Sequence, residues 1–367
     1  MKYKINNIYI EKKFIILNNF LNKNKYNISK VILLLDNNIK KYYLKYFLKK
    51  ISILKKSKFI IIKSGEKYKN IKTCIKIWKK LILFKIDKKS IIINLGGGVI
   101  TDLGGFVSST FKRGIKFINI PTTLLGMIDA SIGGKNAINF YNFKNEIGIF
   151  NNPILIIINK NFIKTLPKNE ILSGLGELLK YGLIYDKKYW NFLKKIDFNN
   201  YKNIKWDKII YKAILIKKKI IDKDPYEKLG IRKILNFGHT IGHSIESFFL
   251  SKNKKITHGE AIALGMICES WISKKIKKLN NNEYEEICNI ILKYFKIKII
   301  KEKYFNKILN YIKNDKKNYN NNIYFSLLNN IGKCSFNKKI NKTLILNSIK
   351  QMNKIYFLKK KKKNEKI

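Results

Sequence analysis

Five short apolar runs in the first half of the chain constrain its fold more than any other feature of the sequence. Each run is rich in isoleucine and bounded by polar residues or glycine; they cover residues 31–35, 59–63, 90–95, 117–120 and 154–158. Runs this short and this apolar are typical of strands buried on both faces of a parallel sheet. Between them lie segments with apolar residues at helical spacing, such as residues 70–84. The alternation predicts a doubly wound, Rossmann-like α/β domain.

Strand signals fade after about residue 168, and helical patterns follow. These patterns cover residues 170–181, 205–221, 237–249, 259–276, 283–294 and 343–356. We therefore predict an α/β domain over residues 1–167 and a mainly α-helical domain over residues 168–358, with the boundary near Pro167. Residues 359–363 are five consecutive lysines, so residues 359–367 are expected to form a solvated, disordered tail.

The 367 residues carry a formal net charge of +53, from 77 Lys and Arg against 24 Asp and Glu. The lysines are spread over the whole chain beside many Ile and Asn, which is typical of an AT-biased genome rather than of a basic patch. We therefore expect no specific nucleic-acid partner. No apolar run approaches the ~20 residues of a membrane span, the N-terminus lacks a signal peptide's apolar region, and the four cysteines are scattered. These features predict a cytoplasmic protein with reduced thiols.

Three consecutive glycines follow the third apolar run, in the segment Gly-Gly-Gly-Val-Ile-Thr-Asp at residues 96–102. Glycines between a strand and a helix, here expected to begin near Asp102, let a ligand approach the backbone, and the helix N-terminus attracts a pyrophosphate. A plain tight turn would use the same residues. Likewise, Asp36 and Asn38 after the first run could hold ribose or adenine hydroxyls, or form an ordinary polar turn.

Residues 122–134 contain no lysine, although lysine is common in the rest of the chain. Such a stretch is expected to be buried or to line a cleft. It includes Asp129 and ends next to Lys135, which we interpret as an anion-binding group.

All three histidines of the chain, His239, His243 and His258, lie close together in the sequence and near glycines. Imidazole is the commonest side-chain metal ligand, and catalytic zinc usually takes three protein ligands. The sequence offers three histidines, or two histidines with a carboxylate. Spacing alone would pair His239 with His243, because residues four apart share a helical face.

The chain resembles the 3-dehydroquinate synthases, a family of sugar-phosphate cyclases in the shikimate pathway, from about Asp36 to Lys333. Two of the matching motifs are Gly-Glu-Leu-Leu-Lys-Tyr-Gly at residues 176–182 and Leu-Asn-Phe-Gly-His-Thr-Ile-Gly-His at residues 235–243. The others are residues 64–69, 96–102, 121–125, 129–135, 144–145, 258–260 and 315–317. In this order and spacing the motifs are highly specific.

The resemblance implies a metal site of Glu177, His239 and His258 that holds zinc, with cobalt as the alternative, and it reserves His243 for the substrate. This set differs from the pairing that spacing favours. We adopt it because Glu177 lies in the family's Gly-Glu-x-x-Lys-Tyr-Gly context, and because mixed histidine and carboxylate ligands suit catalytic zinc.

The resemblance also implies a reaction and a partner. The family converts a seven-carbon sugar-acid phosphate, 3-deoxy-D-arabino-heptulosonate 7-phosphate, into 3-dehydroquinate and phosphate. NAD transiently oxidises a ring alcohol, phosphate is eliminated, the hydride returns, and an intramolecular aldol reaction closes the new ring. Such an enzyme is a carbon–oxygen lyase, and the family implies a homodimer.

Site residues follow by position in the matching motifs. Those expected around the substrate phosphate are Lys135, Asn145, Arg113, His243 and Lys316. Those expected at its carboxylate and hydroxyls are Arg232, Asn236 and Lys217, and those near the metal-bound hydroxyls are Asp129, Lys180 and Glu227. The NAD set is Asp36, Asn38, Ser64, Gly65, Glu66, Lys67, Tyr68, Lys69, Gly98, Val99, Ile100, Thr101, Asp102, Thr122, Thr123, Lys135, Lys144, Phe162, Ile163, Lys164 and Thr165.

Two details of the sequence depart from, or blur, the family pattern. The loop before Arg232 is one residue longer than in the family, so Glu227 and Lys228 compete for its acidic position. Lys217 has two lysine neighbours, at residues 218 and 219, and Lys316 has Lys317.

Arg113 and Arg232 are the only arginines of the chain, and both fall on family positions for substrate anions. The match at Lys144 and Asn145, together with Arg232 and Asn236, favours this activity over a cyclase that closes another ring. A polyol dehydrogenase would have no reason to retain the paired anion-binding residues, and a basic nucleic-acid binder should show decayed motifs and clustered charge.

Overall fold

The five predicted strands lie in one seven-stranded sheet, in the order β1-β2-β9-β6-β5-β3-β4. They are β3 (Val31–Asp36), β4 (Lys58–Ile62), β5 (Ile91–Gly96), β6 (Lys116–Pro121) and β9 (Leu155–Ile158), and each pairs in parallel with its neighbours among them. The prediction of a parallel, buried sheet is therefore confirmed. Two three-residue strands, β1 (Tyr3–Ile5) and β2 (Ile8–Ile10), extend the sheet beside β9; they are too short to leave a sequence pattern.

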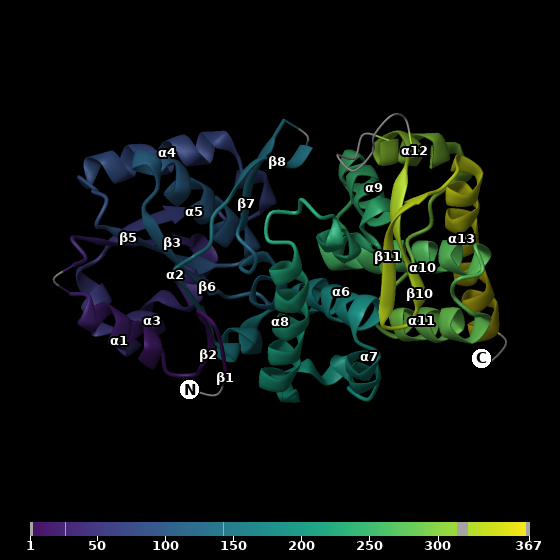
Figure 1. Cartoon of the computed structure of the whole chain (residues 1–367), viewed down its shortest axis with the longest axis horizontal. Helices are drawn as coiled ribbons and strands as arrows, with labels where there is room; N and C mark the ends of the chain where they lie inside the picture. Colours follow the sequence, from purple (N-terminus) through teal and green to yellow (C-terminus); the bar gives the residue numbers. More distant parts are fainter. Residues whose placement is uncertain (1–2, 26, 142, 314–321, 365–367) are drawn as a thin grey trace. The chain divides into compact units, whose positions relative to one another are not determined.

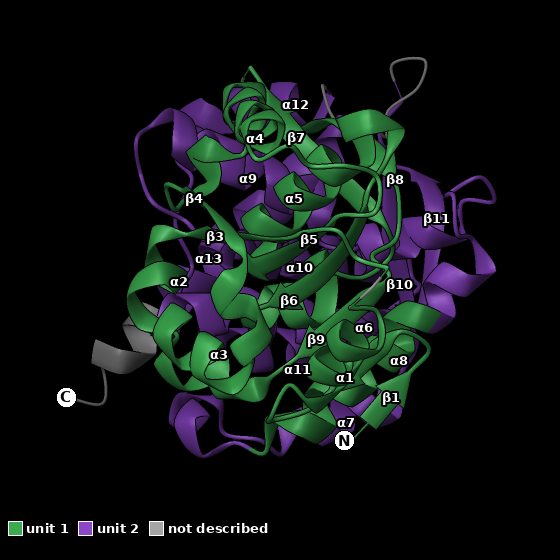
Figure 2. Ribbon diagram, turned by 90° about the vertical axis from the view of Figure 1, so that its left-hand side faces the viewer, with its two compact units in different colours: residues 1–167, 205–218 green, residues 168–204, 219–367 purple. Residues whose placement is uncertain are grey.

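The structure is a computed structural model that describes residues 3–25, 27–141, 143–313 and 322–364, the last six by their backbone alone. The chain divides into two compact units (Figure 2). Unit 1 comprises Met1–Pro167 and Lys205–Lys218, and unit 2 comprises Lys168–Ile204 and Lys219–Ile367. The sequence patterns had assigned Lys205–Lys218 to the helical part, whereas the structure groups this stretch with the sheet.

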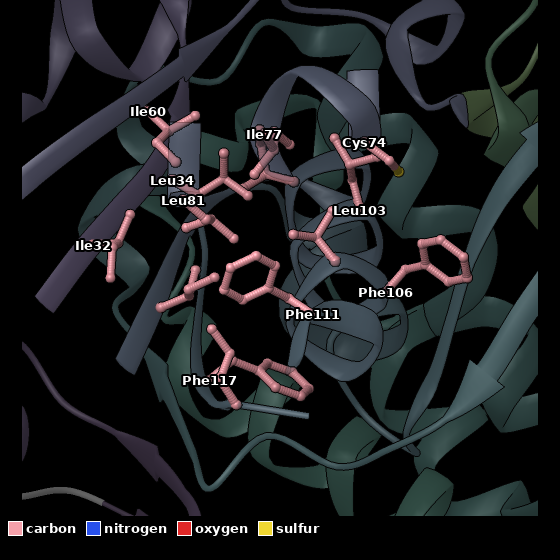
Figure 3. Packing of buried hydrophobic residues seen from close by; sticks show 14 of the residues in the cluster. Ile32, Leu34, Ile60, Cys74, Ile77, Leu81, Leu103, Phe106, Phe111 and Phe117 are labelled. Carbon is pink, nitrogen blue, oxygen red and sulfur yellow. The ribbon is translucent and has the colours of Figure 1, made fainter. Parts of the chain in front are cut away.

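Five helices of unit 1 connect or cover the strands. They are α1 (Ile15–Lys23), α2 (Asn37–Tyr42), α3 (Leu44–Lys50), α4 (Ile71–Leu83) and α5 (Gly98–Thr110). Helix α4 begins where the Asn70 side chain accepts a hydrogen bond from the Thr73 amide. Its buried face, with Cys74, Ile77 and Leu81, packs in one hydrophobic cluster with residues of β3, β4, β6 and α5 (Figure 3).

A two-stranded antiparallel hairpin, β7 (Lys135–Phe140) and β8 (Phe143–Phe150), stands apart from the main sheet. All eight residues of β8 are exposed. Sequence patterning did not predict this hairpin, because the apolar residues of β8 are mixed with charged ones and are exposed. Residues 122–134, before it, are mostly buried, which confirms the prediction for this lysine-free stretch.

Unit 2 is mainly helical, as predicted. Its helices are α6 (Lys168–Tyr185), α7 (Lys187–Lys194), α9 (His239–Ser251), α10 (His258–Lys275), α11 (Asn281–Tyr294), α12 (Phe305–Lys313) and α13 (Lys342–Asn364), and α8 (Trp206–Lys223) spans the division between the units. Helix α10 is buried over almost its whole length and contacts α6, α9, α11 and α13 (Figure 1).

Two expectations for this half of the chain are corrected. An antiparallel hairpin, β10 (Tyr324–Asn330) and β11 (Lys333–Lys339), follows α12, where no strand was expected. Helix α13 continues to Asn364, so the backbone of residues 359–364 is helical where a disordered tail was expected over residues 359–367. Residues 365–367 lie outside the described residues. Among the described residues, no helix is both long and apolar enough to cross a membrane.

Candidate active site

The glycine turn of unit 1 joins β5 to α5. The helix begins at Gly98, four residues before the expected position near Asp102, with Gly97 as its N-cap. A Cβ atom on Gly97 would lie 2.9 Å from Thr123 Cγ2, so a side chain there would collide with the loop after β6. No acidic side chain lies in the first turn of this 13-residue helix. The amides of the turn are therefore well suited to an anion.

Lys69 lies at the centre of a polar cluster near this turn. Its ammonium group is 2.5 Å from Asp102 Oδ2 and 2.6 Å from Asn145 Oδ1, and the side chain is almost fully buried. Burial raises the pKa of the Asp102 carboxyl, and the charge of Lys69 opposes that shift. The structure thus brings together two residues that the resemblance assigns to NAD and one, Asn145, that it assigns to the substrate phosphate.

Most of the other expected NAD residues follow the carboxyl ends of β3, β4, β5, β6 and β9, whereas Lys135 and Lys144 lie in the β7–β8 hairpin. The Asp36 carboxylate caps α2 by accepting hydrogen bonds from the amides of Asn38 and Ile39, at 2.9 and 3.0 Å. This is the ordinary capping role of such a turn, although one oxygen can still accept a ribose hydroxyl. Phe162 and Ile163 are buried, and Thr165 forms a hydrogen bond with Tyr43.

Lys217 is distinguished from its lysine neighbours by burial. Its Nζ atom lies 2.7 Å from Asp129 Oδ1 and also contacts the Asp129 carbonyl oxygen, whereas Lys219 is exposed. The structure therefore joins two of the expected substrate residues of unit 1 in an ion pair. Arg113 and Lys135 are exposed, and Arg113 has a positive φ of 63°. Lys316 and Lys317 lie outside the described residues.

In unit 2 three helices bring the expected metal ligands together. Glu177 lies within α6, while His239 and His258 are the first residues of α9 and α10. Glu177 Oε1 is 3.4 Å from His239 Nε2 and 3.5 Å from His258 Nε2. This oxygen is fully buried and faces both imidazoles. Lys180 contacts the other oxygen of the same carboxylate.

Glycines let these helices approach closely enough to place the ligands side by side. A Cβ atom on Gly176, next to Glu177, would lie 2.7 Å from the carbonyl oxygen of Gly259, next to His258. A Cβ atom on Gly265 would lie 2.0 Å from the carbonyl oxygen of Gly238, next to His239. Backbone therefore packs directly on backbone at each ligand, which only glycine permits.

His243 belongs to the same cluster. Its ring centroid is 5.0 Å from that of His239 and 5.7 Å from that of His258, and ligand atoms of the three histidines lie within 4.8 Å of one another. The i, i+4 pairing is thus geometrically possible as well. Glu177, buried and equidistant from His239 and His258, adds the carboxylate that a purely three-histidine site would lack.

The electrostatics of the cluster favour a cation. Burial lowers the pKa of His258, but hydrogen bonding and Coulombic attraction from Glu177 and Glu246 outweigh it and raise the pKa to about 9. Glu246 Oε2 lies 3.7 Å from His258 Nδ1. Two buried carboxylates beside these imidazoles attract positive charge, and the nitrogen and oxygen donors suit zinc. The residues therefore fit the metal that the resemblance implies.

The loop before α9 holds the expected carboxylate-binding residues. Arg232 is 3% exposed and donates from Nη1 to the Pro225 carbonyl oxygen at 2.6 Å. Asp224 organises this loop, because it accepts hydrogen bonds from the amides of Leu229 and Arg232. Glu227 is half-buried with a positive φ of 61°, and Lys228 is exposed.

Three buried carboxylates of unit 2 were missed by sequence reasoning. Asp224 caps the Arg232 loop, Glu246 faces His258, and Glu269 accepts hydrogen bonds at the start of α9. Glu269 leaves a signal in the sequence, since it is the one charged residue between Ala261 and Ser273. Asp224 and Glu246 leave none that separates them from surface acids.

A parallel α/β unit followed by a mainly helical unit is a fold that solved structures of cyclases and dehydrogenases share. One of them is the 2-epi-5-epi-valiolone synthase from Streptomyces hygroscopicus subsp. jinggangensis, solved with NAD+ and Zn2+ bound. The TM-score is 0.82 at 20% identity, over 96% of this chain and 98% of that one.

Sequence comparison identifies the family within this class. Residues 59–173 match the family model described as 3-dehydroquinate synthase N-terminal, and residues 174–318 match the 3-dehydroquinate synthase C-terminal model. The chain is 36% identical to the 3-dehydroquinate synthase of Parabacteroides distasonis, over 91% of this chain and 93% of the relative. Identity to that of Pelagibacter ubique is 41%, over 88% and 90%. The chain belongs to the 3-dehydroquinate synthase family.

Proposed function

We propose that this chain catalyses the reaction of its family, the conversion of 3-deoxy-D-arabino-heptulosonate 7-phosphate into 3-dehydroquinate and phosphate. The observation that carries the proposal is the buried cluster of Glu177, His239 and His258, in a chain that matches both family models. The reaction breaks a carbon–oxygen bond with loss of phosphate, so the enzyme would be a lyase. Zinc, or cobalt in its place, and NAD would be its cofactors.

The cofactors supply chemistry that side chains cannot. When bound, zinc polarises the reacting alcohol and NAD takes up and returns its hydride. The chain's own part is to hold these groups and to orient the substrate. Glu177, His239 and His258 would hold the metal, and Lys180, in contact with Glu177, would add positive charge beside it.

The nucleotide would lie against the turn at Gly97 and Gly98. Amides of the first turn of α5 would donate to its pyrophosphate, and the Lys69–Asp102 pair beside them would contact the rest of the cofactor. Asp36, at the end of β3, would accept from a ribose hydroxyl. The other NAD residues that the resemblance implies stay predictions. They are Asn38, Ser64, Gly65, Glu66, Lys67, Tyr68, Val99, Ile100, Thr101, Thr122, Thr123, Lys144, Phe162, Ile163, Lys164 and Thr165.

The substrate carries two anionic groups, and cations would hold each of them. Arg232, buried in unit 2, would clamp the carboxylate through its planar guanidinium group, with Asn236 beside it. Arg113, Lys135, Asn145 and His243 would surround the phosphate, as would Lys316. Fixing both ends of the substrate removes much of the entropic cost of orienting the ring. Lys217, held by Asp129, and Glu227 would contact ring hydroxyls.

The homodimer that the family implies is also a proposal, and the hairpin of unit 1 supports it. Strand β8 is the edge of a two-stranded sheet, and Phe143, Ile147, Ile149 and Phe150 on it are exposed. An exposed apolar edge strand promotes association, so a second copy is its natural cover. Sedimentation analysis should give twice the chain mass. The cytoplasmic location stays a prediction.

The activity is tested by measuring phosphate release from the heptulosonate phosphate. We expect release only when zinc and NAD are both present, with no net formation of NADH, because the hydride returns in each turnover. Chelator should abolish release, and added zinc should restore it. Stoichiometric NADH without phosphate release would instead identify a polyol dehydrogenase. DNA binding without cyclase activity would identify a basic binder.

A further inference from the structure

The start of helix α9 lacks a cap of its own. Its N-cap is Gly238, which has no side chain to accept from the free amides of the first turn, and its φ is 79°. A Cβ atom there would lie 2.5 Å from Met266 Cγ and 3.0 Å from the carbonyl oxygen of Ile262. Close packing on α10 therefore requires glycine, and the cap has to come from another element.

Glu269, on α10, supplies that cap from a distance of about thirty residues in the chain. Its side chain is fully buried. Oε2 accepts from the Gly238 amide at 2.6 Å, and Oε1 accepts from the Ile241 amide at 3.0 Å. Both carboxylate oxygens thus bind amides at the positive end of the helix, which favours a charged acceptor.

The capped amide belongs to the same peptide group as the carbonyl that orients His239. His239 Nδ1 lies 3.1 Å from the Phe237 carbonyl oxygen, and Phe237 and Gly238 share one peptide bond. A carbonyl oxygen can only accept, so Nδ1 carries a proton, and in the neutral ring Nε2, which faces Glu177, keeps the lone pair that a metal needs. Because the peptide is planar, the bond from Glu269 to its N–H fixes the direction of its C=O. It also strengthens that oxygen as an acceptor.

We infer that Glu269 is a positioning residue for the metal site, which acts on His239 through the Phe237–Gly238 peptide group. The inference rests on the proposed ligand set of Glu177, His239 and His258. The second histidine has a carboxylate behind it as well, since Glu246 faces His258 Nδ1 at 3.7 Å. Both imidazoles are thereby backed by a buried carboxylate, one directly and one through a peptide group. Partners of this kind orient a metal-bound histidine and raise its basicity.

The test is the zinc affinity of Glu269→Gln, measured by competition with a chromogenic chelator at constant pH. Glutamine keeps the shape but places an NH2 group against one of the two amides. We expect zinc to bind roughly 10- to 100-fold more weakly and the visible absorption bands of the Co2+-loaded protein to shift. Glu11→Gln is the matched control, because Glu11 is a buried carboxylate of unit 1 that caps the amides of Ile15 and Ile16. Glu11→Gln alters a helix cap in the other unit, so the zinc affinity of this variant should equal that of the wild type.

The outcomes separate this inference from the proposed ligand set. If the wild type binds zinc and Glu269→Gln binds it equally well with unchanged Co2+ bands, the role of Glu269 is refuted while the ligand set stands. If the wild-type chain binds no zinc, both are refuted. Should Glu269→Gln fail to fold, NMR of the Co2+-loaded wild type decides. An exchangeable Nδ1–H of His239 that is protected from exchange with deuterium supports the proposed link from Glu269 to His239 through the Phe237–Gly238 peptide group. A His239 ring without that proton overturns the link.

Discussion

The roles of individual side chains in this protein depend on their hydrogen-bond and ion-pair partners. His239 and His258 each have an acceptor at Nδ1, so Nε2 is presented toward Glu177. Lys217 differs from Lys219 in the same way, since only Lys217 is buried against Asp129. Residue type and spacing could not supply these distinctions. A lysine triplet or an i, i+4 histidine pair has the same sequence whether or not other side chains pack against it.

Replacing the histidines one at a time tests the metal ligands. We expect His258→Ala to lose stoichiometric zinc, because the site would keep only two of its three ligands. His243→Ala should retain zinc and lose activity. Metal analysis of the two purified variants gives the answer. The reverse pattern would restore the pairing of His239 with His243.

Arg232→Lys tests the carboxylate clamp. The charge is kept, but an ammonium group cannot reproduce the planar fork of a guanidinium. We expect a loss of about 1–3 kcal/mol of transition-state binding, which is a fall of roughly 5- to 150-fold in kcat/KM. Affinity for DNA, which depends on total charge, should not change. Full cyclase activity in this variant would rule out the clamp.

Lys217→Met and Lys219→Met form a matched pair on one helix. Lys217→Met leaves the Asp129 carboxylate without its ammonium partner, so we expect lower kcat/KM and a free energy of unfolding lower by about 1–3 kcal/mol. Lys219→Met should change neither quantity, because Lys219 is exposed. Equal effects of the two substitutions in kinetic assays and urea titrations would contradict the assignment of Lys217.

At the scale of elements, the candidate sites of the two units are built in different ways. In unit 1 a parallel strand ends in glycines and a helix begins, which presents amides to an anion. In unit 2 three helices meet backbone to backbone at glycines, which aligns one ligand from each. The glycine turn of unit 1 has a sequence signature, whereas the helix packing of unit 2 depends on contacts between distant segments.

Gly97→Val tests the role of the glycine turn in NAD binding. The new side chain would meet Thr123 and block approach to the amides of the turn, so NAD affinity should fall roughly tenfold or more, about 1.4 kcal/mol. Zinc content should not change. Thr110→Val, at the exposed far end of α5, is the control and should bind NAD normally. Unaltered NAD binding by folded Gly97→Val would show that the turn serves only as a bend.

At the scale of the whole molecule, the sequence predicted what periodicity encodes. Five buried strands and most helices were found, because isoleucine runs and helical spacing repeat over several residues. Strands β1 and β2 are too short for such a pattern, and β8 is exposed throughout. The hairpin of β10 and β11 was also missed, although four of the seven residues of β10 are buried. Within the site, resemblance supplied the expected residues, while Asp224 and Glu246 could be found only from the structure.

Metal removal tests how the site contributes to the stability of the chain. Zinc that binds only the folded chain should stabilise it by about 2.7 kcal/mol at a free concentration of 100 times Kd. We therefore expect Tm to rise with added zinc and to fall with chelator, in a calorimetric scan. His258→Ala should show no such rise. An unchanged Tm for the wild type across the zinc titration would argue against this site.

Most of helix α10 differs from the rest of the chain in having no lysine or arginine. About one residue in five is basic (77 of 367), yet residues 258–273 contain no lysine or arginine. This segment carries a metal ligand, the cap of α9 and contacts with four other helices. Nearly every position in this segment serves both folding and chemistry. We therefore infer that substitution by lysine is not tolerated along it. A saturation library of the gene should therefore find its least tolerant segment here, in a helix that a surface view of the protein would scarcely reveal.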